Sequence, residues 1–226
     1  MASLSGAYLR ASWAKDRLLT LNEEIQRFVD VEVENIVLQG NFDGRGPTFE
    51  VGGHRPIPAE VLMLLSEVVF HLRASLDYVV YELSAISSGS YENGTQFPIE
   101  DTPAGFATRK RTYLKGLDPT HVTTIETLQP YRGADWAALL RTLSNQDKHR
   151  TFPLTLHRMR LTSTLPLGLP EKTPSGRIRV KVQFTGVLSI AFADGTPVIR
   201  TLDELHTKVA DTVDLFRPWF ADVSGS

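Results

Sequence analysis

Two predicted helices carry charged and histidine side chains where helical periodicity favours apolar ones. The first holds His71, Arg73 and Asp77, and the second ends with Asn145 and His149. A histidine beside a carboxylate can transfer a proton near neutral pH, and a guanidinium can hold a phosphate through two hydrogen bonds. The spacing therefore predicts a catalytic site in which His149 or His71 exchanges protons and Arg73 binds phosphate. Asn145 would position the phosphate, and Asp77 would orient a neighbouring side chain.

The same helices allow a second interpretation, a buried network of ion pairs. Arg73 and Asp77 lie one helical turn apart, while Asp147 and Arg150 continue the apolar face on which Leu143 lies. Burial of a charge without a partner costs several kcal/mol, so these four groups could satisfy one another. The sequence leaves a structural network and a functional pocket both open.

Basic residues alternate along two predicted strands. Arg177, Arg179 and Lys181 share one face of RIRVKV, and Arg158 and Arg160 share one face of HRMR. If these strands pair in register, five cations line one sheet surface that could bind a polyanion through its phosphates. Pairing across the sheet with the acidic residues of the first predicted hairpin is the alternative.

The remaining chain must supply the elements that position these residues. Apolar residues at steps of three and four predict helices, alternation predicts strands, and Asp118 before a proline predicts a helix cap. We expect one α+β domain over residues 1–226, a helical bundle with an appended antiparallel sheet of about five strands. The predicted helices cover residues 4–29, 59–86, 106–114, 118–129, 135–150 and 201–220. The predicted strands cover residues 31–39, 48–51, 156–165, 177–184 and 187–193.

Composition excludes several classes of chemistry. The chain has 226 residues, a formal net charge of −2 and no cysteine, which excludes disulfides, thiolate metal sites and a cysteine nucleophile. Its histidines show no metal-ligand spacing, and no phosphate-loop or dinucleotide motif is present, so we expect neither metal nor cofactor. The longest apolar run, VLMLLSEVVF, is interrupted by Ser66 and Glu67 and is too short to span a bilayer. We therefore expect a cytoplasmic protein without a membrane partner.

Four motifs follow one another along the chain: HLRASLDYVVYEL, TQFPI, IETLQPY and LSNQDKHR. In this order they resemble a family of uncharacterised bacterial and phage proteins with LRxxLDH-like and NxxDKHR-like helices, over roughly residues 30–220. Tyr78 stands where the first family motif has histidine. The resemblance implies no established activity.

A more distant likeness is to HEPN-type helical ribonucleases, which pair an arginine with a nearby histidine and cleave RNA without metal as dimers. Asn145 and His149 match part of that motif, while Ser144 occupies the arginine position and Arg73 could replace it only from the other helix. This likeness implies RNA as the substrate.

Two functions follow from these observations. The first is a non-catalytic binding or interaction protein with a charged site on the helix pair, and the alternative is a HEPN-like, metal-independent ribonuclease of the phage-defence or toxin type. The expected partner is RNA or another anionic ligand. The amphipathic first and last helices are compatible with a homodimer.

Overall fold

The computed structural model describes most of the chain, in eight stretches. They are residues 2–34, 38–42, 47–51, 56–149, 152–166, 171–172, 178–179 and 182–221. Side chains are described for residues 2–32, 56–147, 152–156 and 189–220.

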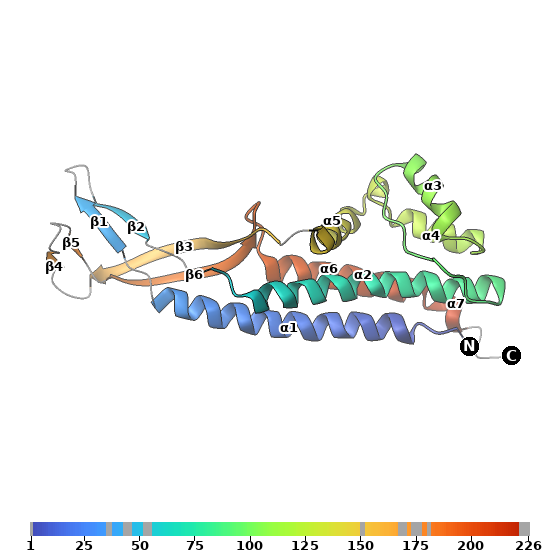
Figure 1. The fold of residues 1–226 in the computed structure, drawn as a ribbon, viewed down its shortest axis with the longest axis horizontal. Helices are drawn as coiled ribbons and strands as arrows, with labels where there is room; N and C mark the ends of the chain where they lie inside the picture. Colours follow the sequence, from blue (N-terminus) through green and yellow to red (C-terminus); the bar gives the residue numbers. More distant parts are fainter. Residues whose placement is uncertain are drawn as a thin grey trace. The chain divides into compact units, whose positions relative to one another are not determined.

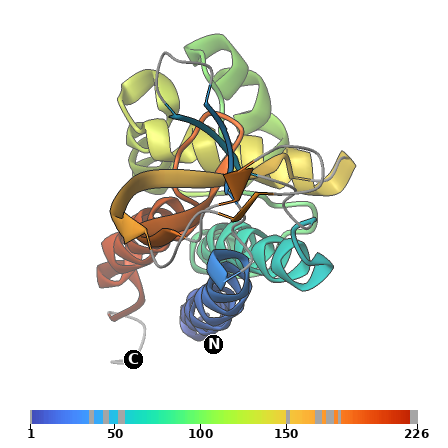
Figure 2. The same cartoon turned by 90° about the vertical axis from the view of Figure 1, so that its left-hand side faces the viewer.

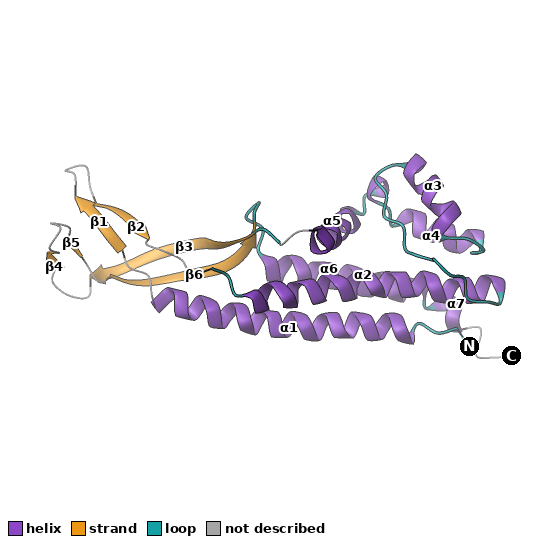
Figure 3. Cartoon of the chain, viewed as in Figure 1, coloured by secondary structure: helices purple, strands orange, loops and turns teal. Residues whose placement is uncertain are grey.

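Helices account for most of the described residues, so the protein is an α+β protein in which helix dominates (Figures 1 and 3). The helices are α1 (Ser5–Glu34), α2 (Ala59–Ser88), α3 (Pro103–Tyr113), α4 (Pro119–Thr127), the 3-10 helix η1 (Pro130–Arg132), α5 (Asp135–His149), α6 (Val198–Phe216) and α7 (Pro218–Ala221). The strands are β1 (Leu38–Phe42), β2 (Pro47–Val51), β3 (Leu154–Pro166), β4 (Glu171–Lys172), β5 (Ile178–Arg179) and β6 (Val182–Phe192). No helix among the described residues is long and apolar enough to cross a membrane.

The chain divides into two compact units. The first comprises Met1–Leu21, Leu62–Phe152 and Ile199–Ser226, and the second comprises Asn22–Val61 and Pro153–Val198.

The first unit is built on α1, α2 and α6, each of which buries a stripe of residues at steps of three and four. On α1 the stripe contains Ala7, Ala11 and Ala14, whose small side chains let another helix approach closely. Figure 2 shows α1 in blue beside α2 in cyan-green and α6 in red. The buried hydroxyl of Ser75 on α2 donates a hydrogen bond to the carbonyl of Ala7 at 2.8 Å. The α2 stripe therefore meets α1 on its alanine face, and His206 of α6 approaches the same face at the carbonyl of Ala11.

Several predicted helices of this unit are confirmed. Asp118 caps α4 by accepting a hydrogen bond from the N–H of Thr120 at 2.8 Å. Thr102 caps α3 in the same way, through the N–H of Gly105 at 3.1 Å. The cap of α3 lies at Thr102, so the helix begins before the predicted residue 106.

The second unit contains two antiparallel sheets. One has four strands in the order β2-β1-β5-β4, and the other has two, β3 and β6. The long β3–β6 hairpin pairs Leu154 with Phe192 at one end and Pro166 with Val182 at the other. Because β3 pairs with β6 and β1 pairs with β5, the predicted sheet of about five strands was wrong for the described strands.

The boundary between α1 and the first strand also differs from the prediction. Residues 31–34 continue α1 and do not begin a strand. Phe28, Val29 and Glu32 are buried at steps of one and three, which is the pattern of a helix face. Packing of this face outweighs the valine alternation, which is typical of a strand.

Candidate functional site

The predicted pair Arg73 and Asp77 is present and faces the extended segment around Phe97. Arg73 Nη2 lies 3.0 Å from Asp77 Oδ1. That carboxylate accepts a hydrogen bond from the backbone N–H of Phe97 at 2.8 Å, and Arg73 donates to the carbonyl of the same residue. The Phe97 ring is fully buried. One helical turn of α2 therefore satisfies both polar backbone groups of a core residue.

Gln129 continues this contact along the same segment. Its Nε2 donates to the carbonyl of Pro98 at 2.9 Å and to that of Ile125 at 3.0 Å. Its Oε1 accepts from the N–H of Glu100 at 3.0 Å. The side chain is fully buried, so these bonds replace water for both partners in the segment.

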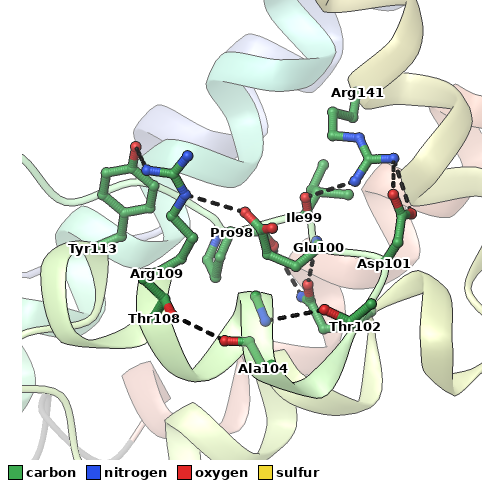
Figure 4. Close-up of polar contacts among 12 residues, drawn as sticks. Pro98, Ile99, Glu100, Asp101, Thr102, Ala104, Thr108, Arg109, Tyr113 and Arg141 are labelled. Atoms are coloured by element: carbon green, nitrogen blue, oxygen red, sulfur yellow. Dashed lines mark hydrogen bonds and ion pairs between the residues drawn. The ribbon is translucent and has the colours of Figure 1, made fainter.

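Arg141 on α5 completes the set. Its Nη1 donates to the carbonyl of Ile99 at 3.1 Å, and its Nη2 contacts both oxygens of Asp101 at 2.9 and 2.7 Å (Figure 4). Two of the four sequence motifs therefore supply side chains that bind the TQFPI segment and the residue after it, through Arg73, Asp77 and Gln129. Arg141, which lies two residues before LSNQDKHR, binds the same segment.

A polar pocket of about 240 Å³ opens beside this segment. Arg73 and Asp77 line it from α2, Arg109 and Tyr113 from α3, and Asn145 from α5. The remaining lining residues are Gln96, Phe97, Pro98, Ile99, Glu100, Arg141 and Ser144.

Arg109 is the most exposed of the three arginines in this pocket. Its Nε lies 3.3 Å from Glu100, and its guanidinium stacks 5.5 Å from the centre of the Tyr113 ring. Figure 4 shows Arg109 between these two side chains. The side chain is 52% exposed, so it can exchange Glu100 for a ligand at little cost to the fold.

Arginine carries five N–H donors. Arg73 contacts Asp77 and the carbonyl of Phe97 through Nη2. Three guanidinium groups and two carboxylates line the pocket, and a third carboxylate, that of Asp101, pairs with Arg141. A bound anion would therefore compete with these carboxylates for the guanidinium donors. Such a site can recognise a carboxylate or phosphate by charge-assisted hydrogen bonds.

His71 lies away from this pocket, against α1. Its Nδ1 is 3.2 Å from Nη1 of Arg10. The centre of its ring is 5.9 Å from that of the Trp13 ring and 5.4 Å from that of the Phe70 ring. Partial burial and the Arg10 charge lower the pKa of His71. The prediction that His71 shares a site with Arg73 and Asp77 is therefore wrong.

The predicted residues at the end of α5 have different positions. Asn145 lines the pocket together with Arg73 and Asp77. Asp147 accepts a hydrogen bond from Ser66 on α2, about three helical turns before Asp77. The side chain of His149 and the whole of Arg150 lie outside the described residues.

The basic strand residues do not share one sheet. Arg158 and Arg160 belong to β3, with an irregular register between them, and Arg179 belongs to β5 of the other sheet. Their common surface was therefore predicted wrongly. Arg177 and Lys181 lie outside the described residues.

The sequence interpretation missed Gln129, Arg109 and Glu100. Gln129 was predicted as the last residue of the helix over 118–129, and no role in a site was predicted for Arg109 or Glu100. A signal was available, because an extended segment such as TQFPI has backbone groups that need partners outside regular structure.

Within the described part of the chain, no group of three or more acidic or histidine side chains is arranged to hold a metal ion. No protein-family model, curated protein or solved structure matches this chain.

Proposed function

We propose that this is a non-catalytic binding protein that takes a small anionic ligand in the pocket beside Phe97–Glu100. The observation that carries the proposal is the convergence of Arg73, Arg109 and Arg141 on one polar cavity. A phosphate or carboxylate there would receive hydrogen bonds from guanidinium groups already held in place, which reduces the entropy lost on binding.

The lining also supports binding over catalysis. Among the side chains that the structure describes, no histidine lines the pocket, and His71 lies elsewhere. Asp77 and Glu100 are each paired with an arginine, an arrangement suited to holding charge and not to exchanging protons.

Titration of the full chain tests this proposal. Inorganic phosphate, citrate and adenosine 5′-monophosphate would be followed by calorimetry and by thermal unfolding, because a ligand that binds only the folded state raises the melting temperature. We expect saturable binding of at least one of these probes.

Arg109→Gln should weaken this binding by about tenfold or more while leaving unfolding without ligand nearly unchanged. The matched control is Arg111→Gln, an exposed arginine of the same helix that does not line the pocket. Absence of binding by all three probes would contradict the proposal, as would equal losses in the two variants.

A metal-independent ribonuclease of the HEPN type is the second candidate. It is favoured by one observation, the presence of Arg141 and Asn145 on the pocket wall one turn apart on α5. His149 is the next residue at this spacing in the sequence, and it would act as the acid–base group.

The test of this candidate is incubation of the protein with single-stranded RNA in excess EDTA. Cleavage that is lost in His149→Ala and Asn145→Ala, with unchanged thermal unfolding, would favour the ribonuclease. Intact RNA under these conditions would reject it and leave the binding function.

A further inference from the structure

We infer that the exposed aromatic face of α1 and α2 is the interface of a homodimer. We define the aromatic face by six side chains: Trp13, Met63, Phe70, Tyr78, Tyr81 and Tyr91. This inference is independent of the ligand pocket.

The centre of the aromatic face is a continuous set of ring contacts. The Arg10 guanidinium lies 5.8 Å from the centre of the Phe70 ring and 5.4 Å from that of Tyr78. The ring of His71 contacts both the Trp13 ring and the Phe70 ring, and so connects Trp13 with this set. These rings remain exposed to solvent, since Phe70 is 55% exposed and Trp13 is 47% exposed.

The face extends in both directions along α2. Met63 lies two turns before Phe70 on the same stripe and is 63% exposed. In the other direction, Tyr81 follows Tyr78 by three residues and stacks on Tyr91 at 4.6 Å between ring centres. Tryptophan, tyrosine, phenylalanine, methionine and arginine are the residues enriched in protein interfaces.

The exposed area supplies about three quarters of one side of a standard dimer interface. At about 200 Å² per side chain, the exposed fractions of the six residues amount to roughly 600 Å². Each partner contributes about 800 Å² to a standard interface, and the neighbouring arginines supply further area. The largest apolar patch on a typical monomer is about 300–600 Å², so this face lies at the upper limit.

The charges on the face favour a second copy of the chain over a polyanion. Arg17 lies 5.7 Å from the Trp13 ring, and its Nε is 3.6 Å from Glu67, with both charged side chains partly exposed. A surface that carries both signs can pair with itself across a two-fold axis, as isologous dimers require. A nucleic acid would instead meet the Glu67 carboxylate.

The experiment is light scattering after size-exclusion chromatography of the full chain, between about 1 µM and about 100 µM. We expect the mass to rise with concentration from one chain to two. Phe70→Glu and Trp13→Glu should each weaken the dimer by about thirtyfold or more, as for residues at the centre of an interface. Circular dichroism and thermal unfolding would check that each variant is folded.

The matched control is Leu215→Glu, an apolar residue of α6 with 45% exposure that lies outside the aromatic face. It should leave the dimer unchanged. A wild-type chain that stays monomeric over the whole range would overturn the inference. So would a folded Phe70→Glu dimer as tight as the wild type, or a monomer that binds single-stranded RNA through Phe70.

Discussion

The carboxylate of Asp77 accepts a hydrogen bond from the backbone N–H of Phe97 at 2.8 Å, across 20 positions of the sequence. Arg73 binds the carbonyl of the same residue and pairs with Asp77. The charges that interrupt the apolar pattern of α2 are therefore used to hold a segment that has no regular structure of its own.

Asp77→Ala should lower the free energy of unfolding by about 2 kcal/mol, because it leaves the Phe97 N–H without its acceptor and Arg73 without its counter-charge. Asp77→Asn keeps an oxygen for the N–H and should lose less. Urea unfolding followed by circular dichroism measures both. The control is Asp101→Ala, whose exposed pair with Arg141 should contribute less than about 1 kcal/mol.

Gln129→Ala should destabilise the protein by at least about 2 kcal/mol, since it leaves the buried carbonyl of Pro98 and the part-buried N–H of Glu100 without partners. Gln129→Glu keeps the acceptor for Glu100 but loses the donor to Pro98, so it should not restore stability. The comparison variant is Gln26→Ala, an exposed glutamine of α1 that should change stability by less than about 0.5 kcal/mol. Similar losses at both positions would argue against a special role for Gln129.

Gly6 gives a prediction for the contact between α1 and α2. A Cβ atom at this position would lie 2.6 Å from Cδ1 of Tyr78, so Gly6→Ala should destabilise by about 1–3 kcal/mol despite the better helix propensity of alanine. In the Tyr78→Ala background the same change should instead stabilise by up to about 1 kcal/mol. A double-mutant cycle measures this change of sign, and additive effects would show that the ring is not the obstacle.

Three histidines have a lowered pKa in the folded protein, so we expect the protein to lose stability in mild acid. Burial lowers the pKa of His71, His121 and His206; Arg10 lowers it further for His71, and Lys15 does so for His206. In the unfolded chain these groups bind protons near pH 6.5, whereas the folded protein resists protonation until lower pH. Stability is therefore complete above about pH 6.5 and falls as the pH drops toward the folded pKa values.

Urea unfolding at about pH 7.5 and about pH 5.5 measures this loss. His206→Gln should reduce it, because the glutamine amide can still donate to the carbonyl of Ala11, as His206 Nε2 does at 3.2 Å, but does not titrate. Thr207→Ala, at an exposed neighbouring position, should leave the pH dependence unchanged. An equal loss in wild type and His206→Gln would remove this histidine as a cause.

The sequence was sufficient to predict the elements in which buried apolar residues recur at a regular spacing. The helices α2 and α5 and the cap at Asp118 were predicted because apolar spacing and cap chemistry are local properties. The continuation of α1 through Glu32 was missed because the valines at positions 31 and 33 alternate as in a strand. Whether this part of α1 is buried depends on contacts with residues far away in the sequence, which a local pattern does not reveal.

The site was predicted only in part for a related reason. Arg73 and Asp77 were identified as charged groups on a helix, but their partner in the structure is the backbone of Phe97. That partner carries no side-chain signal. His71 was misplaced because residues two positions apart on a helix point in different directions.

The contacts of α1 with the C-terminal helices join the most distant parts of the chain. Lys15 pairs with Asp203 at 2.6 Å, and the Tyr8 hydroxyl donates to Asp214 at 2.7 Å, over separations of 188 and 206 residues. During synthesis, α1 therefore cannot form its contacts with α6 until nearly the whole chain has been made. Folding of this unit should be slow, since closing so long a loop precedes the gain from the contacts. Until α6 has been synthesised, the alanine stripe of α1 lacks one of the helices that contact it.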